Sequence, residues 1–144
     1  MDDTDEVFAA LHRALPAQLF TVTLNDGSAG VFRRLWTSDP VAYPVPGVKP
    51  MTGAERAAAL AGDGGVFVAN DPEGFRDFPD HAAIVALGCG SVACLPVRDD
   101  AGWARGTVNL LDVAGYFTPA RLAACAAEVA ARRKALVSAM VLPR

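Results

Sequence analysis

The polar side chains best suited to chemistry gather in the middle of the chain. Asp80 and His81 come directly after Phe78 and Pro79. Asn70 follows a short apolar run, residues 66–69, that has the pattern of a buried strand. An Asp-His pair beside a strand and a polar loop suggests a binding cleft. We therefore expect residues 65–97 to form one wall of a ligand site, with the rest of the chain supplying the other.

Three cysteines raise the alternatives of metal and redox chemistry. Asp80, His81, Cys89 and Cys94 lack the close spacing of a zinc site, so no metal is expected. An odd number of cysteines in a chain with an ample core favours reduced thiols over a disulfide framework. Cys125 falls on the apolar face of the last predicted helix and is interpreted as a core residue. A redox role for Cys89 and Cys94 stays open, since a reactive thiol needs exposure and a positive neighbour.

Apolar spacing predicts the elements that position these side chains. Helices are expected at 5–15, 52–61, 77–87 and from 118 to about 140, and strands at 19–24, 30–37, 66–69, 91–97 and 103–112. Four prolines in residues 39–50 predict an extended loop without regular structure. Asp77 is predicted to cap the third, buried helix, with Asp80 at its third position and Gly88 at its end. The order of elements predicts an α+β fold with a mostly antiparallel sheet.

Length, composition and charge limit the function. The chain has 144 residues, of which 52% are apolar, and this predicts a single domain over residues 1–144 with a substantial core. A net charge of -3, with acidic and basic residues mixed along the chain, disfavours nucleic acid and anionic membranes as partners. No apolar run approaches the roughly 20 residues that cross a bilayer. The acidic start, residues 1–6, is the reverse of a basic signal-peptide region, so a cytoplasmic location is expected.

Several motifs taken together resemble a GAF domain. They are Phe-Val-Ala-Asn at 67–70, Phe-Pro-Asp at 78–80, Leu-Gly-Cys-Gly-Ser at 87–91 leading to Leu-Pro-Val at 95–97, and Gly-Thr-Val-Asn-Leu-Leu at 106–111. The resemblance runs from about Leu19 to the last helix. It implies an antiparallel sheet of about five or six strands, with terminal helices on one face and loops plus short helices over a ligand pocket on the other. The signature of the cyclic-nucleotide-binding members is absent, and no bilin-carrying cysteine is recognisable.

The resemblance places the pocket between the sheet and the segments 38–50 and 70–91. In the last strand Asn109 shares a face with Thr107 and Leu111, while Val108 and Leu110 share the other, apolar face that suits the helices. The same alternation puts Arg34, Trp36 and Ser38 together on another strand. The predicted ligand-binding residues are therefore Arg34, Trp36, Ser38, Tyr43, Phe67, Asn70, Phe78, Asp80, His81, Ser91, Cys94 and Asn109.

Mixed chemistry in this set indicates the class of ligand. Arg34 and His81 suit a carboxylate or phosphate, and the aromatic residues suit an apolar or stacking body. For Asn70 and Ser91 an equal alternative is that they tie loops down by hydrogen bonds from side chain to backbone. The expected function is sensing of a small anionic or heterocyclic metabolite, without catalysis and without a cofactor. The alternative is a free methionine-(R)-sulfoxide reductase, a stand-alone GAF protein, although the cysteine spacing differs from that family's.

The two terminal helices predict a homodimer. In the closing helix an apolar stripe recurs at near-heptad spacing: Leu122, Cys125/Ala126, Val129, Leu136 and Met140. The acidic opening residues Asp2, Asp3, Asp5 and Glu6 would meet the basic segment 132–134 of an antiparallel partner. GAF domains commonly dimerise through these helices, so the resemblance implies the same. The alternative is that the protomer's own sheet covers the stripe.

Overall fold

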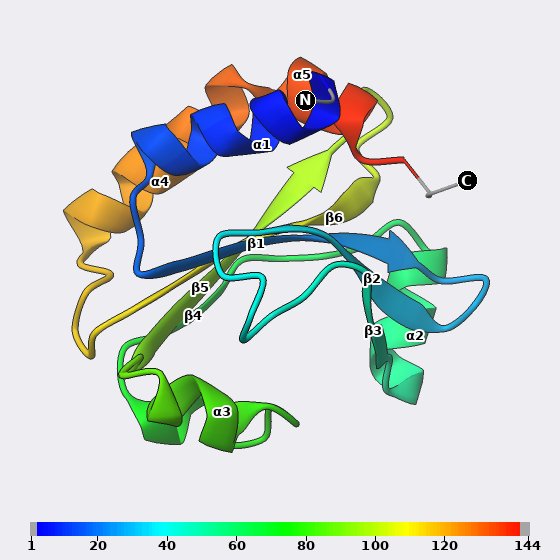
Figure 1. The fold of residues 1–144 in the computed structure, drawn as a ribbon. Coiled ribbons are helices and arrows are strands. Elements are labelled where there is room, and N and C mark those ends of the chain that lie inside the picture. Colours follow the sequence, from blue (N-terminus) through cyan, green and yellow to red (C-terminus); the bar gives the residue numbers. More distant parts are fainter. Residues whose placement is uncertain (1–2, 142–144) are drawn as a thin grey trace.

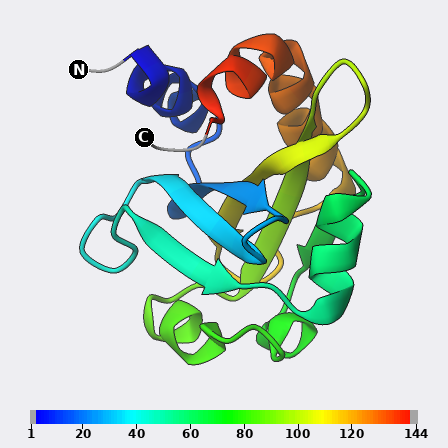
Figure 2. The ribbon, with the colours of Figure 1, turned by 90° about the vertical axis from the view of Figure 1, so that its right-hand side faces the viewer.

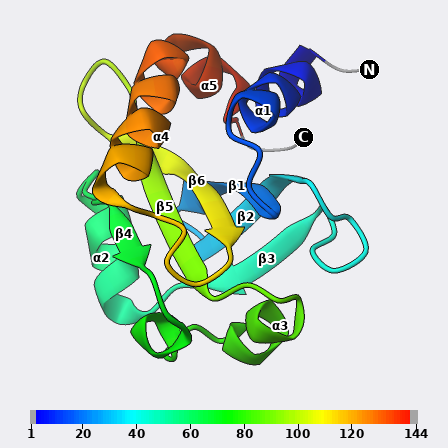
Figure 3. The same cartoon turned by 90° about the vertical axis from the view of Figure 1, so that its left-hand side faces the viewer.

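A six-stranded antiparallel sheet forms the centre of the computed structural model, which describes residues 3–141, with side chains from residue 4 (Figure 1). The strands lie in the order β3-β2-β1-β6-β5-β4, and every neighbouring pair is antiparallel. Figure 3 shows all six side by side. Their bounds are β1 Leu19–Asp26, β2 Val31–Thr37, β3 Gly47–Pro50, β4 Phe67–Ala69, β5 Ser91–Arg98 and β6 Ala104–Asp112.

Helices cover both faces of this sheet. Three of them, α1 (Asp3–Ala14), α4 (Pro119–Ala131) and α5 (Arg133–Ala139), lie together on one face. The short helices η1 (Pro72–Phe75) and α3 (His81–Ala86) lie on the opposite side. Helix α2 (Gly53–Leu60) lies at one end of the sheet, next to the β1–β2 turn, where Arg56 donates to the carbonyls of Gly27 and Ser28 (Figure 2). The predicted α+β fold, with terminal helices on one face and short helices on the other, is confirmed.

The alternation of side chains along β6 separates two cores. Val108 and Leu110 are at most 1% exposed and pack with the terminal helices, whereas Leu111 belongs to a smaller core under η1 and α3. Strand β1 alternates in the same way, with Phe20 and Val22 toward the terminal helices. The face prediction for the last strand is therefore confirmed, and Asn109 lies on the side away from the terminal helices.

Local signals for the helix ends are also confirmed. Thr52 and Glu55 form the reciprocal capping box that starts α2. Thr118 accepts a hydrogen bond from the backbone of Arg121, with Pro119 in the first turn of α4. Gly88 follows α3 with φ of 86°, a left-handed conformation that glycine adopts without steric cost.

Three predictions about the segments over the sheet are wrong. The proline-rich segment is not wholly irregular, because Gly47–Pro50 pairs with β2 as the edge strand β3, where proline is tolerated. The third helix begins at His81 rather than after Asp77, and Asp80 occupies the cap position without a side-chain capping bond. The helix was expected to be buried, but Ile84 is its only buried residue, so α3 lies on the surface and packs through this one side chain.

The last helix is broken, contrary to the expectation of one continuous element. Arg132 has φ of -106° and ψ of 10°, and it separates α4 from α5. Next to the break, the Arg133 guanidinium donates to the carbonyl of Arg98 and to the carboxylate of Asp100. The break thus coincides with an anchor between α5 and the turn that joins β5 to β6. Among residues 3–141, no helix has the length and apolar character needed to cross a membrane.

Candidate functional site

A row of four residues crosses the sheet on the face away from the terminal helices. Thr21 pairs with Asn109, Asn109 with Cys94, and Cys94 with Phe67, so the row spans β1, β6, β5 and β4. Directly paired residues point to the same face of a sheet. The amide of Asn109 donates to the hydroxyls of Thr21 and Thr23 at 3.1 and 2.8 Å. Three of the predicted ligand residues, Phe67, Cys94 and Asn109, thus form one floor.

Arg34 reaches this floor from β2, but Trp36 does not. A register shift sets Trp36 opposite Val22 and Arg34 opposite Thr23, so Leu35 is an extra residue in β2. Arg34 therefore shares the floor face with Thr23. Trp36 turns to the terminal helices, where its ring lies 5.6 Å from Phe20. The prediction that Trp36 lines the ligand site is wrong, because strict alternation fails at a bulge.

Above the floor, two side chains of the proline-rich segment converge on one carboxylate. The Tyr43 hydroxyl donates to Oδ2 of Asp80 at 2.9 Å, and Nζ of Lys49 lies 3.5 Å from Oδ1. The Arg34 guanidinium lies 4.8 Å from the centre of the Tyr43 ring and donates to the carbonyl of Pro44. Predicted residues from three distant segments therefore meet here. We call Arg34, Tyr43, Lys49 and Asp80 the polar cluster.

Burial shapes the protonation of the polar cluster. Tyr43 is 8% exposed, and its desolvation together with its hydrogen bond to Asp80 raises the pKa of the phenol. The phenol therefore keeps its proton and serves as a donor. Desolvation lowers the pKa of Arg34, while the nearby Tyr43 and Asp80 act in the opposite direction. Arginine remains charged at neutral pH in any case.

Lys49 is the member of the polar cluster that sequence reasoning missed. It belongs to β3, the strand hidden in the proline-rich segment, and it lies 5.1 Å from the centre of the Phe78 ring. Phe78 in turn lies 5.2 Å from Phe67. The sequence feature that points to this contact is Gly47. It pairs with Arg34, and a side chain at this position would collide with the Arg34 guanidinium. A glycine two residues before a lysine, opposite an arginine, is too weak a pattern to use alone.

Four of the predicted residues hold loops in place. Asn70 exchanges two hydrogen bonds with the backbone of Phe117, and the hydroxyl of Ser91 donates to the carbonyls of Asp112 and Val113. Ser38 accepts from the backbone of Phe20. The His81 ring contacts the carbonyl of Pro72 at 3.0 Å. These contacts favour the structural alternative for Asn70 and Ser91, and they give Ser38 and His81 a similar role.

The three thiols are unsuited to nucleophilic chemistry. Desolvation raises the pKa of Cys94 to about 12, and it also raises the pKa values of Cys89 and Cys125. Cys89 is 2% and Cys125 6% exposed. Cys125 packs with the terminal helices, on the face of the sheet opposite Cys94. In the part of the chain that the structure describes, no three His, Cys, Asp or Glu side chains are grouped to hold a metal ion.

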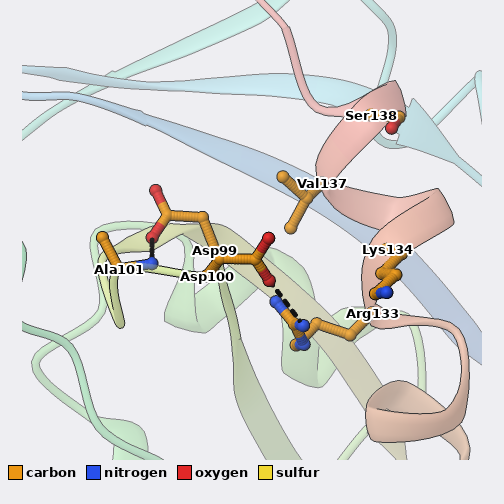
Figure 4. A pocket seen from close by; sticks show the side chains of 7 residues that line it. All are labelled: Asp99, Asp100, Ala101, Arg133, Lys134, Val137 and Ser138. Carbon is orange, nitrogen blue, oxygen red and sulfur yellow. Dashed lines mark hydrogen bonds and ion pairs between the residues drawn. The ribbon is translucent and has the colours of Figure 1, made fainter.

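Two surface pockets lie away from the polar cluster. One lies between α5 and the β5–β6 turn, where Arg133 pairs with Asp100 at 2.8 Å and Asp99 accepts from the backbone of its own turn (Figure 4). Arg133, Asp99 and Asp100 are therefore already engaged. The other lies between α1 and β2, and its lining includes Leu35 and Trp36. Trp36 is the one predicted ligand residue that lines either pocket.

Comparison with known proteins identifies the fold. No family model matches the sequence, and no curated protein matches it. Solved structures match closely in shape. A GAF domain/HD domain protein from Geobacter sulfurreducens has a TM-score of 0.70 at 14% identity, covering 97% of this chain and 95% of that one.

Two further structures share the same shape. The blue-light-absorbing PixJ GAF domain of Thermosynechococcus elongatus has a TM-score of 0.62 at 12% identity, over 93% of this chain and 82% of that one. Free methionine-R-sulfoxide reductase from Neisseria meningitidis, in complex with its substrate, has a TM-score of 0.63 at 18% identity, over 96% and 81%. The sheet order, the terminal helices and these likenesses agree: the chain has the fold of a GAF domain.

Proposed function

We propose that this chain is a GAF-type sensor domain that binds a small anionic or heterocyclic metabolite at the polar cluster, without catalysing a reaction. The observation that supports this most is the convergence of Arg34, Lys49 and Tyr43 over the floor of Asn109 and Cys94. Two cations and a phenol donor suit an oxyanion. The neighbouring Phe67 and Phe78 suit a planar apolar body. A cytoplasmic location remains a prediction from the sequence.

Native mass spectrometry of protein purified from its own cells tests this function, because a retained ligand adds its own mass. We expect Arg34→Ala to lose that mass. Arg33→Ala is the matched control, since Arg33 is adjacent on β2 and pairs with Asp26 instead of the polar cluster. A ligand retained by Arg34→Ala but lost from Arg33→Ala would place the site elsewhere.

The reductase alternative rests on the likeness to the Neisseria enzyme, at 18% identity. It requires a thiolate that attacks the sulfoxide, and the raised pKa values of all three thiols oppose this. Incubation with free methionine sulfoxide and a thiol reductant tests it directly. Steady formation of methionine, abolished by Cys94→Ser, would replace the sensor proposal.

A further inference from the structure

Asp80 is the one acidic group in a cluster that otherwise suits an anion. Its Oδ2 accepts from Tyr43 at 2.9 Å and its Oδ1 lies 3.5 Å from Lys49. Arg34 and Lys49 carry two positive charges against this single negative charge, so the cluster keeps one positive charge in excess. The side chain of Asp80 is 31% exposed, so it reaches the cluster from the surface rather than from the core.

The same carboxylate joins two loops. Tyr43 and Lys49 belong to the segment 39–50, whereas Asp80 precedes α3. No side-chain cap on α3 uses the Asp80 carboxylate, so its contacts serve the cluster and not the helix. On its other side, the segment is held to β2 by the bond from Arg34 to Pro44. Breaking the contacts to Asp80 would therefore remove the polar link between the two segments and leave the ring contacts, those of Lys49 with Phe78 and of the Tyr43 ring with Phe75.

We propose that the Asp80 carboxylate occupies the place of the ligand's anionic group, so that the structure shows a closed and self-occupied site. This inference rests on the proposed function. An anionic ligand binds by displacing Asp80 from Tyr43 and Lys49, and the loss of this polar link, which loosens the segment before α3, reports that the ligand is bound. The ligand class is a carboxylate or phosphate attached to a planar ring, which lies against Phe67 and Phe78.

Three probes of one shape and different charge test the displacement. Benzoate, benzamide and benzamidine carry charges of -1, 0 and +1 on the same ring. Each is titrated into the full chain while backbone amide shifts are followed by NMR. Asp80→Asn keeps the size of the side chain and removes its charge. We expect it to tighten benzoate by about 3- to 10-fold, because like charges no longer compete for Lys49, and to leave benzamide nearly unchanged.

The matched control is Asp77→Asn, which removes an exposed carboxylate three residues away that has no hydrogen bond or ion pair among the described residues. It should leave benzoate binding as in the wild type. Lys49→Met removes the ammonium and keeps an unbranched chain, and it should abolish the preference for benzoate over benzamide. Equal tightening by Asp77→Asn would show a general charge effect and overturn the role of Asp80.

Hydrogen exchange tests the closure without any ligand. The Tyr43 amide donates to Asp39 at 2.8 Å and is therefore measurable, and its exchange should rise at least about 5-fold in Asp80→Asn. Unchanged exchange would overturn the closure. Benzoate could shift the amides of the polar cluster while binding no more tightly to Asp80→Asn than to the wild type. That result would refute displacement of Asp80 and leave the proposed binding function standing. If benzoate shifts no cluster amide in either protein, both fail.

Discussion

Tyr43 donates a 2.9 Å hydrogen bond to Asp80, and this bond joins two loops that are 37 residues apart in the chain. The ring of Tyr43 belongs to the smaller core, with Phe75 and Ile84, while its hydroxyl reaches the polar cluster. One side chain therefore connects the packing under η1 and α3 to the charged groups above the floor. This arrangement explains why Tyr43 is only 8% exposed although it lies in a proline-rich segment.

Tyr43→Phe should lower the free energy of unfolding by about 1 kcal/mol, because a partly buried hydrogen bond to a carboxylate is lost while the ring stays packed. Urea unfolding followed by fluorescence measures this change. Tyr116→Phe is the matched control, since its hydroxyl has no hydrogen bond within the described part of the chain and its ring contact with Arg121 remains. Equal losses in both variants would mean that the Tyr43 hydroxyl contributes nothing specific.

The thiols should be nearly inert in the native protein. With a pKa of about 12, roughly 1 in 10,000 of the Cys94 thiols is ionised at pH 8. We expect labelling by Ellman's reagent at pH 8 to be at least about 100-fold slower in the folded protein than in urea, where all three cysteines become available. Rapid labelling of one thiol that disappears in Cys94→Ser would contradict this and support the reductase alternative.

The β1–β2 hairpin should carry a pH-dependent contribution to stability. The Asp26 pKa lies below its ordinary value, first because of its hydrogen bond with Arg33 and next because of the backbone of Ala29. A depressed folded pKa stabilises the fold above the unfolded pKa, and this contribution is lost as pH falls through the folded value. Asp26→Asn should lower the free energy of unfolding by under about 1 kcal/mol at pH 7 and leave it almost unchanged near pH 2.

Urea unfolding at both pH values measures this difference. Asp63→Asn is a suitable control, since Asp63 has no side-chain hydrogen bond or ion pair among the described residues. A deficit of Asp26→Asn that stays constant from pH 7 to pH 2 would show that the ionised carboxylate is not its source.

The sequence predicted the sheet well because alternation along β1 and β6 is regular. It failed at β2 because one extra residue, Leu35, reverses every later side chain, and nothing in the local composition marks that position. Strict alternation therefore predicts Trp36 in the ligand site, whereas its ring packs on Phe20. The site residues that strand alternation could place, Asn109 and Arg34, were placed correctly on the floor face.

The parts of the candidate site that the sequence did not predict depend on contacts between segments that are distant in the chain. Lys49 and Asp80 are 31 residues apart, and neither belongs to a motif that indicates the other. The sequence predicts Asp80 in the first turn of a helix, where a carboxylate is favourable, yet its carboxylate contacts Tyr43 and Lys49 of the proline-rich segment. Long-range pairing of this kind depends on how two irregular segments fold over the sheet, and a single sequence carries little information about it.

The homodimer remains a prediction, but its surface must differ from the stripe that suggested it. Cys125, Val129, Leu136 and Met140 are at most 6% exposed and belong to the protomer's own core. Glu6 pairs with Arg13 of the same helix, and Arg133 with Asp100, so these charges are also engaged. The acidic residues Asp2 and Asp3 lie outside the residues whose side chains are described.

The outer face of α4 is one surface of the terminal helices that is exposed to a partner. Ala123, Ala127 and Ala130 are exposed there, and small side chains let two helices approach closely. A stable interface buries about 1,200–2,000 Å² and is rich in large apolar side chains, whereas this face presents alanine, so we expect a weak, transient dimer with a Kd on the order of tens of micromolar.

Sedimentation equilibrium on the full chain tests the dimer. Ala127→Glu places a charge in the centre of the proposed interface and keeps a good helix former, so it should give a folded monomer at all concentrations. Ala57→Glu makes the same change on the exposed face of α2 and should leave the dimer intact. At several hundred micromolar, on the order of ten times the expected Kd, most chains should be paired. A wild-type protein that stays monomeric at this concentration would rule out association through α4.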